Sequence, residues 1–256
     1  MIYLVLGMHK SGTTMVSQLM QDSGIDMGVV DRGDISYDEG EKFEDPWASL
    51  ITKAVLRVPW RHNSLEIPDT GKIEADERLR VVAQRYVLDR SQGAQDWGFK
   101  EPRASLVYDF WREMLPEHKV VFVLRRPEEI WVRYMRRFPW YRPYKRIRRG
   151  VMALRAWCFY NERLLGSLER DNADYTLLLF SRLVGEETEF KRLESFLGRE
   201  LKDSRKTDLY RNRTMKTSRV FAYRLHKCVL MAITSFSVDR TWNRLTKNRL
   251  EKEVNS

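Results

Sequence analysis

The stretch from Gly7 to Thr14, Gly-Met-His-Lys-Ser-Gly-Thr-Thr, brings two glycines, a lysine and three hydroxyl side chains together. Such a set is suited to an anion. The glycines let backbone N–H groups come close to it, the lysine supplies positive charge and the hydroxyl groups donate hydrogen bonds. The stretch therefore predicts a binding site for a phosphate or a sulfate group, in which Lys10, Thr13 and Thr14 take part.

The flanking residues indicate how this stretch is positioned. Ile2–Leu6 is a short apolar run, typical of a buried strand, and the apolar residues from Met15 to Met20 recur at helical spacing until Gly24. A strand, a glycine-bounded turn and a helix in this order present a helix N-terminus to an anion. The alternative is an ordinary strand–turn–helix without a ligand.

The loop differs from the Walker A motif of ATPases. That motif needs a lysine directly after its second glycine, whereas Lys10 precedes Gly12 by two residues and Thr13 takes the place of the Walker lysine. The loop instead resembles the 5′-phosphosulfate loop of sulfotransferases that use 3′-phosphoadenosine-5′-phosphosulfate (PAPS). In that family the loop holds the 5′-phosphate of the nucleotide.

A second stretch, Asp96–Arg103, supports the resemblance. It reads as a short strand that ends at Pro102, followed by a helix from Ala104 to Leu115. Because ligands of parallel sheets lie beyond the carboxyl ends of the strands, we expect Lys100 and Arg103 on the same rim as the glycine loop. The stretch resembles the Lys-Asp-Pro-Arg motif of a bacterial-type sulfotransferase group, with Glu in place of Asp. The resemblance implies that Lys100 faces the sulfuryl group. A surface cluster of charges is the alternative.

A third stretch follows another buried strand, Lys119–Leu124. A P-loop NTPase would place a metal-binding aspartate there, but this strand is followed by Arg125, Arg126 and Pro127. A guanidinium group matches phosphate oxygens in a bidentate manner. The stretch resembles the 3′-phosphate element of the family: Arg125 and the proline match, Arg126 replaces an Asp or Asn, and Arg133 replaces a serine.

The general base is expected in the acidic segment from Asp26 to Asp45. Glu44 lies between Phe43 and Pro46, where a partly shielded carboxylate could have a pKa raised toward neutrality. In several branches of the family an acidic residue after the first helix deprotonates the acceptor. The resemblance implies this role for Glu44, with Asp45 and Arg103 expected beside the acceptor. His62 or a base from residues 133–149 is the alternative.

Two basic segments complete the expected site. Residues 133–149 contain eight basic residues, no acidic residue and several aromatic ones, which suits a lid or an acceptor-binding loop. A nucleic-acid surface and a solvated loop are the alternatives. In the family a late basic loop closes over the 3′-phosphate, and Arg211 or Arg213 matches that loop. The apolar and basic stretch Ser218–Phe236 could dock on the sheet, pair with a second subunit or touch a membrane.

Composition sets the remaining expectations. The chain has 256 residues, a net charge of +10 and a pI near 9.6, which favours anionic partners. Cys158 and Cys228 lie in helical patterns, no signal peptide precedes the first strand, and no apolar run reaches ~18 residues. These features predict a cytoplasmic protein with one domain over residues 1–256, in which residues 214–256 form a basic helical extension.

The resemblance covers residues 2–196 and implies a three-layer α/β domain of the P-loop type, with helices flanking a central parallel sheet. It implies transfer of a sulfuryl group from PAPS to a hydroxyl or amine of a glycan, lipid or small molecule, with release of 3′-phosphoadenosine-5′-phosphate (PAP) and without a metal. Lys10 and Lys100 would stabilise the developing charge, Glu44 would take the proton, and Arg125 with Arg133 would hold the 3′-phosphate. The expected contacts to the 5′-phosphate come from Ser11, Gly12, Thr13 and Thr14.

Two other classes of function stay open. One is a P-loop kinase or another nucleotide phosphotransferase, which would need Mg²⁺. The other is a non-catalytic basic module that binds polyanions with a steep salt dependence. A nucleic-acid partner is not expected, and the sequence leaves the acceptor and the oligomeric state open.

Overall fold

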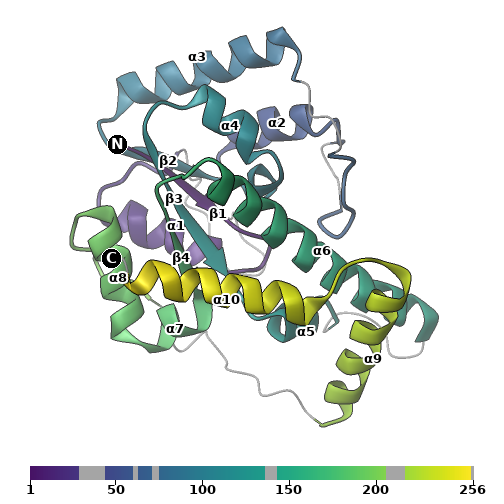
Figure 1. Ribbon diagram of the computed structural model, residues 1–256. Helices are drawn as coiled ribbons and strands as arrows, with labels where there is room; N and C mark the ends of the chain where they lie inside the picture. The colour runs from purple at the N-terminus through teal and green to yellow at the C-terminus, as the bar shows by residue number, and fades with distance from the viewer. Residues whose placement is uncertain (29–43, 60–62, 71–74, 136–142, 206–216, 255–256) are drawn as a thin grey trace.

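The computed structural model describes residues 1–28, 44–59, 63–70, 75–135, 143–205 and 217–254. Within them, four parallel strands form one sheet in the order β2-β1-β3-β4 (Figure 1). The first strand therefore lies inside the sheet. The strands are β1 (Ile2–Leu6), β2 (Trp97–Lys100), β3 (His118–Leu124) and β4 (Tyr175–Leu179).

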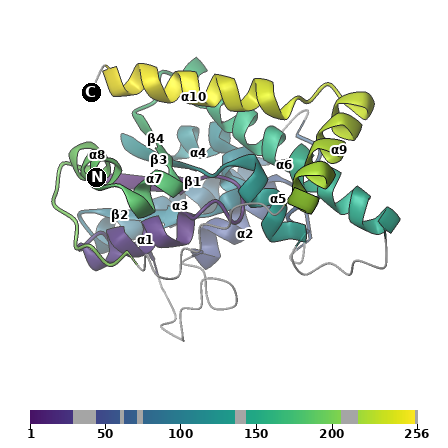
Figure 2. The ribbon, with the colours of Figure 1, turned by 90° about the horizontal axis from the view of Figure 1, so that it is seen from below.

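Helices cover both faces of the sheet, which makes a three-layer α/β fold (Figures 1 and 2). Alternate residues of β1, such as Tyr3 and Val5, pack with α1, α7 and α8, whereas Leu4 and Leu6 face the larger core with α4, α6 and α10. Covered faces on both sides explain why the strands are apolar at nearly every position. The helices are α1 (Thr13–Asp22), α2 (Pro46–Val55), α3 (Glu77–Gly93), α4 (Tyr108–Met114), α5 (Pro127–Met135), α6 (Pro143–Arg170), α7 (Phe180–Gly185), α8 (Glu187–Leu197), α9 (Thr217–Ile233) and α10 (Val238–Val254).

The register of the sheet determines which residues meet at its carboxyl edge. Val5 of β1 pairs with Lys100 of β2, and Leu6 pairs with Phe122 of β3. On the other side, Leu124 pairs with Leu179. The segments that follow β1, β2 and β3 therefore leave the sheet side by side.

Two predicted boundaries were wrong. Residues 143–149, which were expected to belong to a basic loop over residues 133–149, are instead the first turns of α6, which begins at Pro143. Pro143 suits a first helical position, where no N–H donor is needed. The helix expected from Ala104 is instead a 3₁₀ turn over Pro102–Leu106, followed by α4.

The C-terminal helices pack on the rest of the fold. α9 crosses α6 at Gly150, where an added Cβ would lie 2.0 Å from Nδ1 of His226. The indole N–H of Trp131 donates a 2.8 Å hydrogen bond to that nitrogen. α10 lies on α6 and β4, and its Arg249 forms an ion pair with the buried Glu189. None of the helices in these described ranges combines the length and apolar character needed to cross a membrane.

The buried His226 gives the stability of the fold a pH dependence. Burial, and then the positive charge of Arg146, lower the pKa of His226, so the folded state holds it neutral while the unfolded chain takes up a proton below pH ~6.5. The free energy of unfolding should therefore fall as pH decreases through and below that value. In His226→Gln, whose amide oxygen can still accept the indole hydrogen bond, the loss between pH 7.5 and 5.5 should be smaller by up to ~1.4 kcal/mol per pH unit.

Chemical denaturation of both proteins at the two pH values measures this difference. The pKa of His118 is also lowered by burial, but His118 is present in both proteins and its effect cancels in the comparison. An identical pH dependence in the two proteins would contradict the role of His226.

Candidate active site

The glycine loop begins directly after β1 and depends on both of its glycines. Gly7 has φ 143°, donates its N–H to Oγ of Ser105 at 2.9 Å, and would place a Cβ 2.4 Å from the carbonyl oxygen of Val123. Gly12 has φ 107°, and a Cβ there would lie 1.9 Å from the ring of Phe180. Backbone at these angles and in such close contact is accessible to glycine alone.

The end of the loop offers hydrogen-bond donors to an anion. Gly12 precedes α1 without a side-chain cap, and its carbonyl accepts the N–H groups of Met15 and Val16. Within the described ranges, the N–H groups of Thr13 and Thr14 are therefore the open donors of the helix N-terminus. Oγ of Ser11 is buried and has no hydrogen-bond partner in the described part of the chain. Because the N–H of Ser11 donates to the carbonyl of Met8 at 3.1 Å, its hydroxyl is the group available to a ligand.

Lys10 projects from the middle of the loop. Its residue is exposed and its backbone has a left-handed φ of 68°, a conformation that costs energy for a non-glycine residue and is often found at functional sites. The carbonyl oxygen of Lys10 accepts a hydrogen bond from Nη1 of Arg125 at 3.3 Å. The loop and the end of β3 are thus in direct contact.

Arg125 is held in a fixed position by its neighbours. Its Nε lies 2.7 Å from Oε2 of Glu129, its guanidinium group stacks 4.5 Å from the ring centre of Phe180, and the residue is only 5% exposed. Trp157 donates its indole N–H to the carbonyl of Arg125. The guanidinium group is therefore pre-positioned beside the glycine loop, where it could meet a phosphate.

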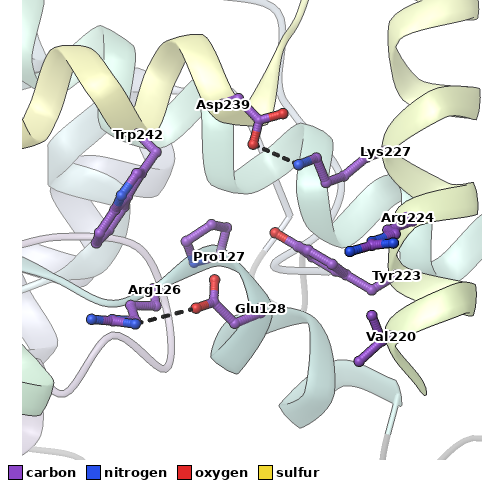
Figure 3. Close-up of a pocket in the computed structure, with 9 residues that line it drawn as sticks. All are labelled: Arg126, Pro127, Glu128, Val220, Tyr223, Arg224, Lys227, Asp239 and Trp242. Atoms are coloured by element: carbon purple, nitrogen blue, oxygen red, sulfur yellow. Dashed lines mark hydrogen bonds and ion pairs between the residues drawn. The ribbon is translucent and has the colours of Figure 1, made fainter. Parts of the chain in front are cut away.

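Arg126 contacts a different part of the molecule. It lines a cavity of about 390 Å³ between α5, α9 and α10, together with Tyr223 and Trp242 (Figure 3). Nη1 of Arg126 lies 3.8 Å from Oε1 of Glu128. Of the two adjacent arginines, Arg125 is thus the one in contact with the loop.

The other arginines predicted for the 3′-phosphate come later in the chain. Arg133 lies half-buried in the last turn of α5. Arg211 and Arg213 lie outside the described residues.

Lys100 and Glu44 form an ion pair at the carboxyl end of β2. Nζ of Lys100 lies 2.9 Å from Oε1 of Glu44, and the two side chains are 2% and 30% exposed. Lys100 pairs with Val5, two residues before the glycine loop begins. The structure thus brings together two residues that are 56 positions apart in the chain and for which the sequence predicted a catalytic role. Glu44 is less shielded from solvent than the sequence suggested, because its side chain is 30% exposed. The charged group beside it is the ammonium group of Lys100.

Further charged side chains are buried behind this ion pair. Glu101 is fully buried, and its Oε1 accepts the backbone N–H of Arg103 at 2.9 Å and lies 3.8 Å from Nη1 of the same residue. Burial, and then the charge of Glu44, raise the pKa of Glu101. Burial lowers the pKa of Lys53, against the opposing effect of Glu101. Buried groups with perturbed pKa values are concentrated at functional sites.

Lys53 is a residue of the site that was not predicted from the sequence. It lies on the buried face of α2 with Ser49 and Thr52. A lysine among inward-facing polar residues of an amphipathic helix was the signal that could have identified it. Sequence patterns place such residues on a face, but they do not show which carboxylate lies opposite.

Asp45 has a structural role in addition to any contact with an acceptor. Its Oδ1 accepts the N–H of Ala48 at 2.8 Å and caps α2, and the residue is 4% exposed.

Two apolar side chains of α2 face solvent: Trp47 is 60% exposed and Leu50 is 46% exposed. These apolar side chains lie within two turns of Glu44, and they were not predicted from the sequence as part of the site. Residues 29–43 and 60–62, which include His62, lie outside the described residues.

Taken together, the parallel sheet, the glycine loop after β1 and the helix N-terminus of α1 define a P-loop-type α/β protein. A family model described as "Sulfotransferase family" matches residues 3–203. The chain belongs to the sulfotransferase family. The helices α9 and α10 lie beyond the matched residues.

Solved structures support the same fold. The sulfotransferase domain from the olefin synthase of Synechococcus PCC 7002 is 13% identical, with a TM-score of 0.51 over 96% of this chain and 93% of that chain. Sulfotransferase STF9 from Mycobacterium avium is 14% identical, with a TM-score of 0.54 over 98% of this chain and 76% of that chain. Comparison with curated protein sequences gives no significant match.

The packing at Gly12 allows a test by a matched pair of substitutions. Gly12 and Gly24 both have positive φ, but a Cβ at Gly24 would meet nothing within 4 Å. Gly24→Ala should therefore lower the free energy of unfolding only by the cost of placing an alanine at a positive φ. Gly12→Ala should lower it by ~1–3 kcal/mol more, because its Cβ must displace Phe180. Urea denaturation of the two variants measures the difference. Equal losses would show that the contact with Phe180 is relieved without cost.

Proposed function

We propose that this sulfotransferase uses PAPS as its donor and transfers the sulfuryl group to a hydroxyl or amine of an acceptor, with release of PAP. The observation that carries the proposal is the ion pair of Lys100 and Glu44 beside the glycine loop, at the carboxyl edge of β1 and β2. A lysine to stabilise a leaving group and a carboxylate to take a proton are the two groups that this reaction needs.

The loop fits the 5′ side of the donor. The N–H groups of Thr13 and Thr14 point out of the helix N-terminus, and the buried hydroxyl of Ser11 has no hydrogen-bond partner in the described ranges. The dipole of α1 and these hydrogen-bond donors together favour a phosphate group at this position. Lys10, which projects from the same loop, lies where it could reach the oxygen between phosphate and sulfuryl group.

Arg125 is our candidate for the 3′-phosphate. It is already oriented by Glu129, Phe180 and the carbonyl of Lys10, so little side-chain entropy is lost when it binds an anion. We propose that Arg133 and the basic residues Arg211 and Arg213 add to this contact.

The chemistry follows from the charges. As the bond between sulfur and the bridging oxygen breaks, negative charge grows on that oxygen, and the ammonium groups of Lys10 and Lys100 stabilise it. The acceptor oxygen or nitrogen forms the new bond to sulfur, and its proton moves to Glu44. Protonation of Glu44 weakens its ion pair with Lys100, so the full charge of Lys100 acts on the leaving oxygen when it is most needed. Two lysines and backbone dipoles supply the positive field, and the proposal includes no metal.

The surface next to Glu44 favours an acceptor with an apolar body. Trp47 and Leu50 are exposed one and two turns along α2 from the ion pair. Exposed aromatic and aliphatic side chains beside polar reacting groups are common in binding sites for small molecules. We therefore propose an aromatic or lipid-like alcohol or amine as the acceptor class.

The donor assignment predicts that the protein distinguishes PAP from ADP. PAP should raise the melting temperature markedly more than ADP, because its 3′-phosphate adds a charge-assisted contact to Arg125. A hundredfold excess over the dissociation constant corresponds to ~2.7 kcal/mol of stabilisation. Thermal-shift measurements with both ligands, with and without EDTA, test this.

Arg125→Ala should abolish the difference between PAP and ADP. Arg126→Ala is the matched control, because Arg126 lines the cavity on the side of α9 and α10 and should leave the difference intact. Equal shifts with PAP and ADP in the unmodified protein would remove the basis for the assignment of Arg125.

The base assignment predicts a selective loss of turnover. Glu44→Gln should lower turnover by ~10²–10⁴ while PAP binds almost as well as before, since the nucleotide is held at other points. Asp45→Asn is the control: asparagine still caps a helix, so this variant should stay folded and active. Steady-state rates and PAP titrations of both variants measure these effects.

Two other results would contradict the assignment. An active Glu44→Gln with an inactive Asp45→Asn would transfer the role to Asp45. Full activity of both variants would leave His62 or a base from residues 133–149 as the candidate.

A further inference from the structure

An apolar stripe on α9 faces solvent. Phe221 is 73% exposed and Leu225 is 41% exposed, and the exposed Cys228 and Ala232 continue the same row at spacings of three and four residues. Residues at this spacing lie on one side of a helix. The opposite side of α9 is buried through His226 and Leu230. The exposed stripe is therefore additional to the face that holds α9 on the fold.

The surroundings of the stripe are basic. The sequence of α9 contains Arg219, Arg224 and Lys227 but no Asp or Glu. Lys227 is neutralised by Asp239 of α10, whereas Arg224 is exposed. Among the described residues, the acidic side chains that line the adjoining cavity are Glu128 and Asp239.

The start of α6 has the same character. From Pro143 to Asn161 the chain has five Lys or Arg residues and no acidic residue. Tyr144 is 77% exposed and Ile147 is 37% exposed, and the cations Lys145 and Arg148 are exposed between and beside them. Apolar and cationic side chains thus alternate on this part of the helix.

These two segments lie together. α9 crosses α6 at Gly150, one turn after the exposed residues of α6, and His226 holds the crossing through its contact with Trp131. Figure 1 shows α9 and the start of α6 at the same end of the molecule, and the turned view in Figure 2 agrees. We call this end, with Tyr144, Lys145, Ile147, Phe221, Arg224 and Leu225, the basic–apolar end.

We propose that the basic–apolar end docks on a membrane surface that carries anionic lipids. Phe221 and Leu225 enter the interface between headgroups and acyl chains, and the cations around them meet the lipid phosphates and carboxylates. An amphipathic helix with aromatic and aliphatic residues beside Lys and Arg is the usual element for such binding.

The same observations argue against two other partners. A nucleic acid would contact the cations and could stack on aromatic rings, but it offers nothing to Leu225 and Ile147. A second copy of the chain in a two-fold contact would bring two basic surfaces against each other, which like charges oppose. An anionic bilayer satisfies both the charges and the apolar side chains.

Sedimentation with vesicles tests the proposal independently of any sulfuryl transfer. The full chain should bind vesicles of phosphatidylcholine mixed with phosphatidylserine about tenfold or more tightly than vesicles of phosphatidylcholine alone. The binding should weaken as salt is added, because the lipid surface potential is screened.

A matched set of variants identifies the surface. The double variant Phe221→Ser/Leu225→Ser should lower binding to the anionic vesicles about tenfold or more, because both apolar side chains leave the interface. Leu250→Ser is the control: Leu250 is also an exposed leucine, at 56%, but it lies on α10 next to Glu251, and binding should not change. Lys145→Gln/Arg224→Gln should reduce binding to anionic vesicles only. Melting temperatures of all variants confirm that they are folded.

Four results would overturn the proposal. They are no vesicle binding, equal binding to neutral and anionic vesicles, equal losses in Phe221→Ser/Leu225→Ser and Leu250→Ser, and self-association that Phe221→Ser abolishes. Tight binding of single-stranded DNA that depends on Lys145 and Arg224, without vesicle binding, would assign the surface to a nucleic acid instead.

Discussion

The close contact between Gly12 and Phe180 is the constraint on which the site depends. Phe180 begins α7 directly after β4, and its ring fills the space that a side chain at residue 12 would need. The same ring supports the guanidinium group of Arg125, which in turn bonds the carbonyl of Lys10. The ends of β1, β3 and β4 are thus connected through one aromatic side chain, and the loop geometry follows from that connection.

Buried charge is concentrated on the other side of the loop. Lys100, Glu101 and Arg103 are nearly inaccessible to solvent, and Lys53 joins them from α2. Burial of several ionised groups is unfavourable for stability unless each has a partner. A fold keeps such a cluster where a strong local field is useful, and the ion pair with Glu44 connects this cluster to the reacting groups. The carboxyl end of β2 is therefore a place where the structure keeps buried charges that folding alone would not favour.

Predictions from the sequence succeeded where a local pattern has a local cause. The apolar strands and the glycine loop between a strand and a helix follow from residue type and spacing over a few positions. The parallel sheet was implied by the family resemblance and is confirmed. The predictions failed at the start of α6 and at Lys53. The start of α6 is helical because Pro143 opens a helix that continues unbroken to Arg170, although its first turns look like a basic loop. Lys53 reads as an ordinary helix lysine until Glu101 is seen opposite it.

The sequence by itself identified the strand, glycine loop and helix from Ile2 to Met20 and the candidates Lys100 and Arg125, because each lies in a pattern of a few consecutive residues. The resemblance to the sulfotransferase family implied the three-layer α/β class. Tertiary structure alone decided that Glu44 meets Lys100, that Arg125 turns to the loop while Arg126 turns to α9 and α10, and that the basic start of α6 and the helix α9 lie at one end. These outcomes depend on strand register and helix packing between residues far apart in the chain, and no local pattern specifies which side chains such packing brings together.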